Sequence, residues 1–231
     1  MTAPTRRERL RTATVAEIKA GARKLLVAGG VEAVSLRAIA RDMGMTAPAI
    51  YRYFPSLEAL VAGVAGDLYD ELRHRLEQAR DEADDPVARL TAMARAFRAW
   101  SVAHPAEFGL IFGAPTPALE AFVAGCADAD HPGARFGAVF VEPFLDLWHR
   151  NPWPGPPPEL LRERLGDRLE PLRASHGEIP IEVTYAFLAG WTRLYGLVAM
   201  EVFGQLSWAL TDPGPLFDLE LTTFLATLVE G

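Results

Sequence analysis

The sequence predicts an all-α protein, and three observations support this prediction. Apolar residues recur at spacings of three and four along most of the 231 residues, as they do on the buried face of a helix. Glycine, proline, serine and threonine stand where this periodicity stops and restarts, which is typical of helix ends. Beyond residue 84, no segment alternates apolar and polar residues as a half-buried strand does. Half of the residues are hydrophobic, so the chain can bury a substantial core.

The N-terminal end is predicted to be a basic arm followed by an amphipathic helix. Residues 1–13 are polar and rich in arginine, so we expect a flexible arm there. From residue 14 the sequence TVAEIKAGARKLLVAGG places apolar side chains on one face at spacings of three and four. The Gly29-Gly30 pair ends this helix.

Two short helices joined by a tight turn are predicted next. Ser35 is a suitable N-cap for the helix LRAIARDM, and Gly44 suits the left-handed conformation that ends a helix. Thr46 can cap the following helix, APAIYRYF, and Pro48 stands in its first turn, where a missing N–H is tolerated. Two short helices joined through a glycine turn are typical of a helix-turn-helix. We therefore expect a three-helix domain of this kind at residues 14–55.

Residues 56–231 are predicted to form a larger helical domain. A long helix is expected from Ser56 to about residue 82. The proline-rich connector NPWPGPPP, residues 151–158, is expected to be a stiff spacer, although such a sequence can also serve as the ligand of an SH3-like domain. The other helices are expected at residues 86–104, 105–113, 117–127, 134–150 with a bend or break at Pro143, 159–172, 180–204 and 213–230, with a turn at 175–180.

Charge is distributed unevenly along the chain. The formal net charge is −7, but residues 1–53 carry +6 and the remaining residues carry −13. A basic segment on an acidic body suggests a polyanion site within the first fifty residues. A solvated basic face explains the charge alone equally well.

The sequence offers no recognisable catalytic, metal or cofactor site. Its five histidines and its single cysteine, Cys126, lack the spacing of metal ligands, and no glycine-rich nucleotide-binding pattern occurs. We therefore expect no metal, no cofactor and no enzymatic activity. An enzyme would need a site assembled from scattered residues, and a helical small-molecule-binding protein or enzyme without DNA binding is the alternative of a different class.

A cytoplasmic location is expected. A single cysteine suits a reducing compartment, and no apolar run follows the basic N-terminus as it would in a secretory signal. The most apolar stretch, VTYAFLAGWTRLYGLVAMEVF, is interrupted by Arg193 and closed by Glu201, and charges of this kind are expensive in lipid. A membrane span is therefore disfavoured.

The third helix of the N-terminal segment has the composition of a helix that reads DNA. Its small residues at the start allow close approach to base edges in a major groove, and its tyrosine hydroxyls can reach phosphate oxygens. Tyr51 and Tyr53 could instead pack against the body of the protein. The candidate DNA-binding residues are Ser35, Arg37, Thr46, Ala47, Pro48, Ala49, Tyr51, Arg52 and Tyr53.

The block SLRAIARDMGMTAPAIYRYFPSLEALV resembles the N-terminal DNA-binding domain of the TetR/AcrR family of transcriptional regulators. The similarity runs from about Thr14 through Val61 and includes Ile39-Ala40, Gly44, Ile50-Tyr51, Tyr53-Phe54 and Leu60. It implies a homodimeric, ligand-responsive regulator, most simply a repressor, that binds a palindromic double-stranded DNA operator. One position departs from the family pattern. Leu57 stands where family members often carry a cation for a phosphate, and the arginines of residues 1–13 could compensate for it.

The C-terminal part carries a second, shorter resemblance. The segments AWSVAHPAEFGLIF and WTRLYGLVAMEVFGQL resemble the C-terminal domain of the TetR subgroup named for a Trp-His-Gly signature. Trp191 and Gly196 match that signature, but Tyr195 occupies the position of the histidine. The helix 180–204 is apolar all round, so it must be buried on all sides, and with the helix 213–230 it could form the interface of a homodimer. An ordinary monomer core is the alternative, and the resemblance to the TetR family favours the dimer. The apolar face expected at this interface contains Phe187, Trp191, Leu194, Val198 and Val202.

A cavity for a small hydrophobic or aromatic ligand is expected within residues 56–231, because many bulky rings occur there with few charges. Any one of these rings could instead be an ordinary core residue. The candidate lining residues are Phe97, Trp100, His104, Phe108, Phe112, Phe140, Phe144, Trp148, Tyr185, Trp191 and Tyr195, with Arg193 as a further polar anchor.

Overall fold

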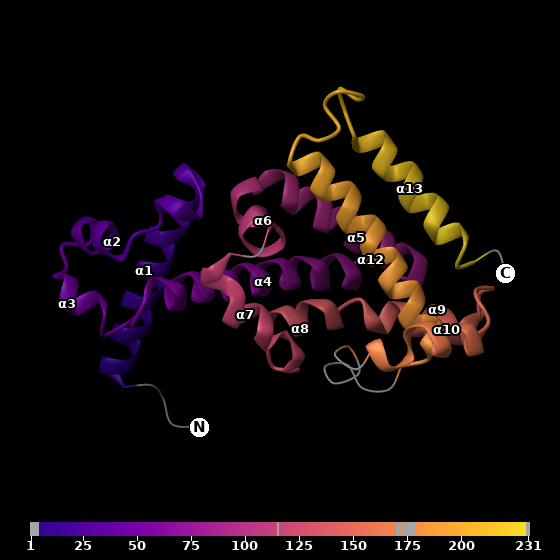
Figure 1. The fold of residues 1–231 in the computed structure, drawn as a ribbon, viewed down its shortest axis with the longest axis horizontal. Helices are drawn as coiled ribbons and strands as arrows, with labels where there is room; N and C mark the ends of the chain where they lie inside the picture. Colours follow the sequence, from indigo (N-terminus) through magenta and orange to yellow (C-terminus); the bar gives the residue numbers. More distant parts are fainter. Residues whose placement is uncertain (1–4, 115, 170–171, 173–178, 230–231) are drawn as a thin grey trace. The chain divides into compact units, whose positions relative to one another are not determined.

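The computed structural model describes residues 5–114, 116–169, 172 and 179–229. Within these residues there are helices and turns and no strand, so the all-α prediction is confirmed (Figure 1). The α-helices are α1 (Arg6–Gly29), α2 (Leu36–Asp42), α3 (Ala47–Ile50), α4 (Leu57–Asp81), α5 (Pro86–Ala103), α6 (Pro105–Phe112), α7 (Glu120–Ala124), α8 (Pro132–Ala138), α9 (Val141–Arg150), α10 (Pro158–Leu165), α12 (Ile181–Val202) and α13 (Gly214–Ala226). Short 3-10 turns are η1 (Val31–Ala33), η2 (Pro117–Leu119), η3 (Gly125–Ala127) and η4 (Gly166–Leu169).

The chain divides into two compact units. The N-terminal unit contains residues 1–68 and 106–124, and the C-terminal unit contains residues 69–105 and 125–231. The long helix α4 therefore contributes its first half to one unit and its second half to the other. These limits differ from a division at residue 55, because α6 and α7 group with the N-terminal helices.

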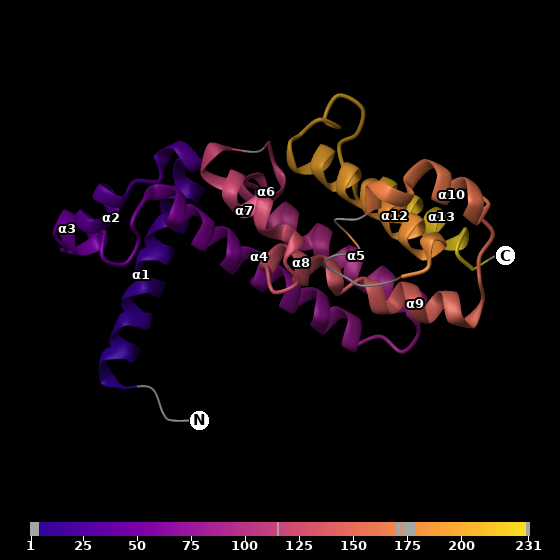
Figure 2. The same cartoon turned by 60° about the horizontal axis from the view of Figure 1, so that its bottom comes forward.

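Helix α6 joins the N-terminal unit through its buried residues. Leu110 of α6 lies beside Ala22 and Leu26 of α1 and Val61 of α4 at one small hollow. Hydrophobic contacts of this kind hold a segment to a core even when it is distant in sequence. Figures 1 and 2 show α1, α2 and α3 gathered at the N-terminal end of the ribbon.

Helix α1 begins earlier than expected, and this is a correction to the flexible arm. Thr5 caps the helix, since its hydroxyl accepts from the Glu8 N–H at 3.2 Å while the Glu8 carboxylate accepts from the Thr5 N–H at 2.6 Å. This reciprocal capping box satisfies backbone donors that a helix start leaves free. Hydrogen bonding with the backbone and the side chain of Thr5 also lowers the pKa of Glu8. Residues 6–13 are therefore the first two turns of α1.

The break expected at Pro143 lies earlier in the chain. Helix α8 ends at Ala138, and Pro143 stands in the first turn of α9. A proline in a first turn removes an N–H that has no intrahelical partner, so it does not interrupt the helix. Of the helix expected at residues 159–172, the described part up to Leu169 consists of α10 and η4, and the turn expected at 175–180 lies largely outside the described residues.

The C-terminal unit has an aromatic core. The Phe97 ring is fully buried and meets Trp191 edge-on, with 5.4 Å between the ring centroids. Phe136 packs against both of these rings. The Trp100 indole N–H donates to the Glu71 carboxylate at 2.9 Å, which satisfies a polar group that burial would otherwise leave without water. No described helix is long and apolar enough to cross a membrane.

Candidate DNA-binding surface and ligand pocket

The turn between α2 and α3 is fixed by a complete Schellman motif. The Met45 N–H donates to the Ala40 carbonyl at 2.8 Å and the Gly44 N–H donates to the Arg41 carbonyl at 3.2 Å. Gly44 has a φ of 65°, a left-handed conformation that side-chain-bearing residues rarely adopt. At the other end of α2, the Ser35 hydroxyl caps the helix by accepting from the Ala38 N–H at 3.4 Å.

Helix α3 is anchored by two apolar side chains. Ile50 is completely buried and Phe54 is 9% exposed. A Cβ added to Gly63 of α4 would lie 3.3 Å from the Phe54 ring, so this glycine lets the ring approach the helix closely. Beyond Ile50 the chain continues in turns, with the Tyr53 and Phe54 N–H groups donating to the Ile50 carbonyl. The two anchors fix which side of α3 faces solvent.

The opposite side of α3 carries the candidate residues for base contact. Thr46, Ala47 and Pro48 are exposed, and Ala49 is half-buried. Thr46 occupies the N-cap position, but its hydroxyl makes no capping hydrogen bond. That hydroxyl therefore stays available to an external acceptor or donor, beside side chains small enough to approach a base edge.

The candidates for phosphate contact lie around this helix. Tyr51 is 45% exposed, so it does not pack into the body of the protein. Arg37 and Arg52 are exposed, and Ser35 and Tyr53 are half-buried. The fold thus brings all nine candidate DNA-binding residues to α2, α3 and the turns beside them.

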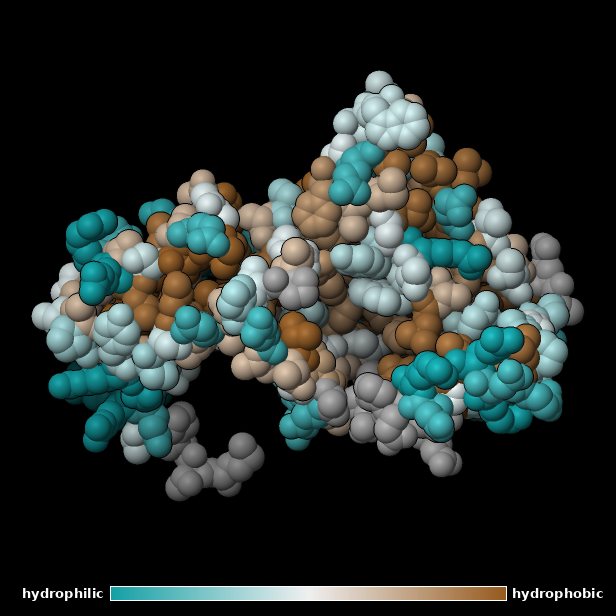
Figure 3. Space-filling model, viewed as in Figure 1, coloured by the Kyte–Doolittle hydropathy of each residue, from teal (hydrophilic) through white to brown (hydrophobic). Residues whose placement is uncertain are grey.

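A basic groove extends this surface along the start of α1. The groove has a volume of about 700 Å³ and is lined by Arg6, Arg7, Leu10, Arg11, Thr14, Met45, Ala49, Arg52 and Tyr53. The Arg11 guanidinium lies over the Tyr53 ring, 5.3 Å from its centroid. Figure 3 shows the hydrophilic start of α1 at the lower left. The sequence showed four arginines here, but only a helical start of α1 places Arg11 against Tyr53.

Leu57, where the family pattern has a cation, is the first residue of α4 and is half-buried. The preceding Ser56 hydroxyl accepts from the Ala59 N–H at 3.2 Å. The start of α4 therefore presents no side-chain cation at this position.

The candidate ligand-binding residues do not line one cavity. Phe108 and Phe112 belong to the N-terminal unit, where their rings pair at 5.2 Å. Phe97, Trp100 and Trp191 pack in the core of the C-terminal unit. Only about 40 Å³ is open beside Phe140, Phe144 and Trp191, which is room for little more than a water molecule.

His104 and Tyr195 are held by their neighbours in the C-terminal unit. The His104 Nδ1–H donates to the Trp100 carbonyl at 2.8 Å, and its ring stacks on the Trp100 indole at 5.2 Å. Tyr195 stacks on Trp191 at 6.0 Å. Burial raises the pKa of the Tyr69 hydroxyl, and the nearby Cys126 and Tyr195 raise it further. Cys126 itself is half-buried, and burial raises the pKa of its thiol.

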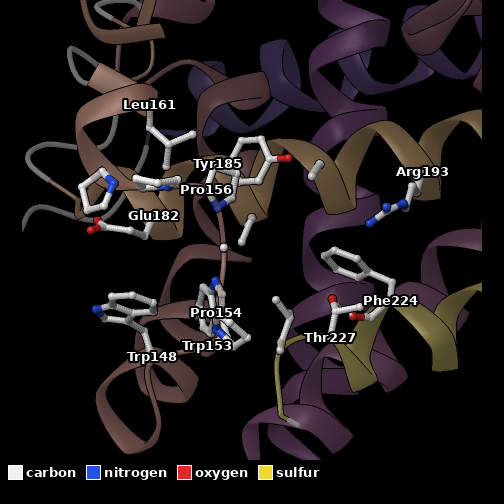
Figure 4. Close-up of a pocket in the computed structure, with 16 residues that line it drawn as sticks. Trp148, Trp153, Pro154, Pro156, Leu161, Glu182, Tyr185, Arg193, Phe224 and Thr227 are labelled. Carbon is white, nitrogen blue, oxygen red and sulfur yellow. Dashed lines mark hydrogen bonds between the residues drawn. The ribbon is translucent and has the colours of Figure 1, made fainter. Parts of the chain in front are cut away.

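A larger pocket lies around Trp148 and Tyr185, two of the candidates. Its volume is about 350 Å³, and α9, α10, α12, α13 and the proline-rich connector contribute to its walls (Figure 4). Trp153, the prolines of the connector, Glu182 and Phe224 also line it and were not foreseen as ligand contacts. Arg193, expected as a polar anchor, stands at this pocket. Connector residues could have been suspected from Trp148, which precedes NPWPGPPP, and Trp153, which lies within it.

Part of the α12 face that was expected at a subunit interface is buried in the core of the C-terminal unit instead. Val198 is fully buried and Trp191 packs against Phe97, so these residues belong to the core of the unit. An exposed and half-buried stripe of uncharged residues on α12 and α13 is called here the α12–α13 stripe, and Arg193 and Glu220 stand at the hollow between the two helices. The stripe consists of Tyr185, Ala189, Thr192, Gly196, Met200 and Phe203 on and after α12, and Leu219, Thr222, Thr223, Ala226 and Val229 on and after α13.

Comparison with known proteins places this geometry in a family. Residues 18–64 match bacterial regulatory proteins of the tetR family, and residues 90–224 match the tetracyclin repressor-like C-terminal domain. The chain is 34% identical over 217 residues to the HTH-type transcriptional regulators Rv1816 of Mycobacterium tuberculosis and Mb1846 of Mycobacterium bovis, covering 90% of this chain and 89% of each relative.

Solved structures agree with this assignment. The crystal structure of the regulatory protein SCO4313 is 30% identical, covers 96% of this chain and 100% of its own, and superposes with a TM-score of 0.74. A Rhodococcus protein at 20% identity shares the fold, with a TM-score of 0.68. A helix-turn-helix with an exposed small-residue helix, joined to a helical C-terminal unit and matched over most of its length, identifies this chain as a member of the TetR family of transcriptional regulators.

Proposed function

We propose that this regulator binds a palindromic operator as a homodimer and represses transcription until a small effector in its C-terminal unit releases it. The proposal depends on one observation, which is that α3 has one side held in the core and the other side exposed. Ile50 and Phe54 hold one side in the core, while Thr46, Ala47 and Pro48 project into solvent on the other. A helix of this kind can enter a major groove by its N-terminal end.

The roles of the surrounding residues follow from their chemistry. Thr46, Ala47, Pro48 and Ala49 meet base edges, and the threonine hydroxyl is free to bond there because it does not cap the helix. Tyr51, Tyr53, Arg37, Arg52 and Ser35 bind phosphates, which fixes the register of the protein without reading sequence. Arginines at the start of α1 add phosphate contacts that Leu57 does not supply.

Dimerisation is proposed through the α12–α13 stripe. Gly196 lies in the middle of this stripe, and a Cβ added there would meet no atom within 4 Å, so another helix can approach its backbone closely. Met200 on α12 and Leu219 on α13 are exposed apolar side chains of the same stripe. A two-fold axis through this stripe pairs two recognition helices, as a palindromic operator requires.

The release mechanism is a shift of population between two states. Helix α4 has residues in both units, so a displacement of this helix changes the separation of the two recognition helices in a dimer. An effector that binds one of the two states more tightly favours it, and operator affinity falls if that state spaces the helices incorrectly.

The test is fluorescence anisotropy with the DNA upstream of the regulator's own gene. The wild-type protein should bind this DNA specifically, and Thr46→Ala should lose about 1–3 kcal/mol of discrimination between operator and unrelated DNA. Tyr51→Ala should weaken binding to both kinds of DNA, because it removes a phosphate contact. Leu160→Ala, on exposed α10, is the matched control and should bind as the wild type does.

Helicity is checked by circular dichroism for every variant. An interaction that is the same in all variants, or absent in the wild type, would favour a helical small-molecule-binding protein that does not bind this DNA. A reporter gene behind the same operator distinguishes repression from activation, since repression predicts higher expression when the regulator is deleted.

A further inference from the structure

The 350 Å³ pocket around Trp148 is large enough for a ligand of its own. Small-molecule sites usually measure about 300–1,000 Å³, whereas the hollow beside the core rings measures about 40 Å³. It is lined by α9, α10, α12, α13 and the connector rather than by the aromatic core. A ligand here would not displace Phe97 or Trp191.

One end of this pocket is rich in aromatic rings. Trp148 and Trp153 meet edge-on, with ring centroids 4.8 Å apart, and Trp153 is 7% exposed and thus firmly held. Tyr185 lines the same pocket and is 38% exposed. The face of an aromatic ring carries negative potential and attracts cations, most strongly for tryptophan.

The connector adds hydrogen-bond acceptors to this end but almost no donors. Residues 154–158 all line the pocket, and four of the five are prolines, which have no backbone N–H. Each still has a carbonyl oxygen. A ligand that donates hydrogen bonds therefore suits this wall better than one that accepts them.

The carboxylate of Glu182 supplies a negative charge. Glu182 lines the pocket from the first turn of α12 and is half-buried. Among the residues that the structure describes, it makes no ion pair or hydrogen bond. A carboxylate in the first turn also interacts favourably with the helix dipole, so its position alone would not indicate a ligand site. Here it coincides with two tryptophans and a connector that has almost no backbone N–H donors.

Arg193, the cation that lines the same pocket, stands away from the Glu182 end. Arg193 stands at the other side of the view in Figure 4, with its guanidinium over the Phe224 ring at 5.2 Å. Eleven residues of α12 separate it from Glu182, which corresponds to about 16 Å along the helix. The two backbone positions are thus farther apart than the Debye length of about 8–10 Å at physiological ionic strength, which weakens the repulsion between Arg193 and a cation at Glu182.

We infer that this pocket binds an organic cation, a protonated amine on a flat aromatic body, with the ammonium group at Glu182 and the ring against Trp148, Trp153 and the prolines. An anionic aromatic compound would need Arg193 instead and would meet the carboxylate of Glu182. A neutral aromatic compound would use the rings but gain nothing from the charge.

Isothermal titration calorimetry of the full-length protein with three indoles of equal ring size separates these classes. Tryptamine is a cation, 3-methylindole is neutral and indole-3-acetate is an anion. We expect tryptamine to bind about tenfold more tightly than 3-methylindole, with indole-3-acetate weakest. Glu182→Gln should remove this preference and leave 3-methylindole unchanged, because it removes only the charge.

Two variants serve as controls. Arg193→Gln should leave tryptamine affinity intact, and Glu163→Gln on α10, an exposed carboxylate outside the pocket, should have no effect. Equal affinities for tryptamine and 3-methylindole would overturn the inference. So would tighter binding of indole-3-acetate that Arg193→Gln abolishes, or the absence of tryptamine binding in a protein of native helicity.

Only the regulatory consequence of this site rests on the proposed function. Tryptamine is therefore also added to the operator complex. Binding by calorimetry without a change in operator affinity would leave the cation site intact and contradict effector release at this pocket. Operator release by a compound that does not compete with tryptamine would support the proposed function and place its effector elsewhere.

Discussion

The Arg23 Nε–H of α1 donates to the Glu107 carboxylate of α6 at 3.0 Å, and the Glu107 side chain is only 5% exposed. This ion pair ties α6 to the helix that precedes the helix-turn-helix. Replacing Glu107 with alanine leaves Arg23 without this acceptor, and we expect the free energy of unfolding to fall by about 1–3 kcal/mol. Glu107→Gln should lose less, because its amide oxygen can still accept.

Urea unfolding followed by circular dichroism measures both changes. Glu120→Ala, on exposed α7, is the control and should be within about 0.5 kcal/mol of the wild type. Equal stability of Glu107→Ala and wild type would contradict a stabilising role for the ion pair.

The glycine of the helix-turn-helix turn should tolerate substitution poorly. Gly44 has a φ of 65°, and alanine in the left-handed region costs about 1–2 kcal/mol. Gly155 has a negative or extended φ and no atom near an added Cβ, so Gly155→Ala provides the comparison. Thermal unfolding of both variants tests this. If Gly44→Ala had the same melting temperature as Gly155→Ala and the wild type, the left-handed turn would not strain an alanine.

The oligomeric state should respond to charge in the α12–α13 stripe. Gly196→Glu places a carboxylate at the proposed point of closest approach, where an isolated charge would lose its water. Sedimentation equilibrium should report a monomer for this variant and a dimer for the wild type. Leu160→Glu on α10 should remain dimeric. Dimeric Gly196→Glu protein of unchanged stability would exclude this stripe as the interface.

The start of α1 should control the salt dependence of operator binding. Each phosphate contact contributes about 0.9 to the slope of log affinity against log salt concentration. The double variant Arg6→Gln, Arg7→Gln should therefore flatten the slope by up to about two for each protomer. Arg162→Gln on α10 is the control. An unchanged slope in the double variant would mean that the groove residues do not bind phosphates.

Stability should fall in mild acid because of His131. The His131 Nδ1 accepts from the Gly133 N–H at 3.1 Å at the start of α8, which requires an unprotonated nitrogen. Burial lowers the pKa of His131, and Arg135 lowers it further, while Asp128 opposes them. The unfolded chain therefore takes up the proton first, and the stabilisation is lost as the pH falls below about 6.5.

Urea midpoints of the wild type and His131→Asn at pH 7.5 and 5.5 measure this loss. Asparagine can cap the same helix at either pH, so the variant should lose less stability between the two values. Equal losses in both proteins would assign the acid sensitivity to other groups.

Much of this fold could be predicted from the sequence because helix ends have local signals. Ser35, Gly44 and the glycine pair at residues 29–30 mark the ends of helices, and the structure places them there. The capping box of Thr5 and Glu8 is equally local, but the density of arginine nearby favoured an arm. Residues 6–13 are helical because the hydrogen bonds of the capping box to backbone donors outweigh the repulsion between exposed arginines.

The ligand site was harder to predict because periodicity shows that a ring is buried and not what it packs against. Phe97 and Trp148 have similar sequence environments, yet one lies in the core and the other lines a pocket. The same reason applies to α12, where apolar residues occur all round and Val198 could not be told from Met200. The similarity to the Trp-His-Gly subgroup stays a prediction.

The chain's single cysteine makes the spacing of the recognition helices accessible to spectroscopy. Cys126 is half-buried and burial raises the pKa of its thiol, so little of it is in the thiolate form that reacts with maleimides. A second cysteine introduced at exposed Ala47 would react first. Spin labels attached there would report the distance between two copies of α3 directly, with and without effector, without replacing any native residue of the C-terminal unit.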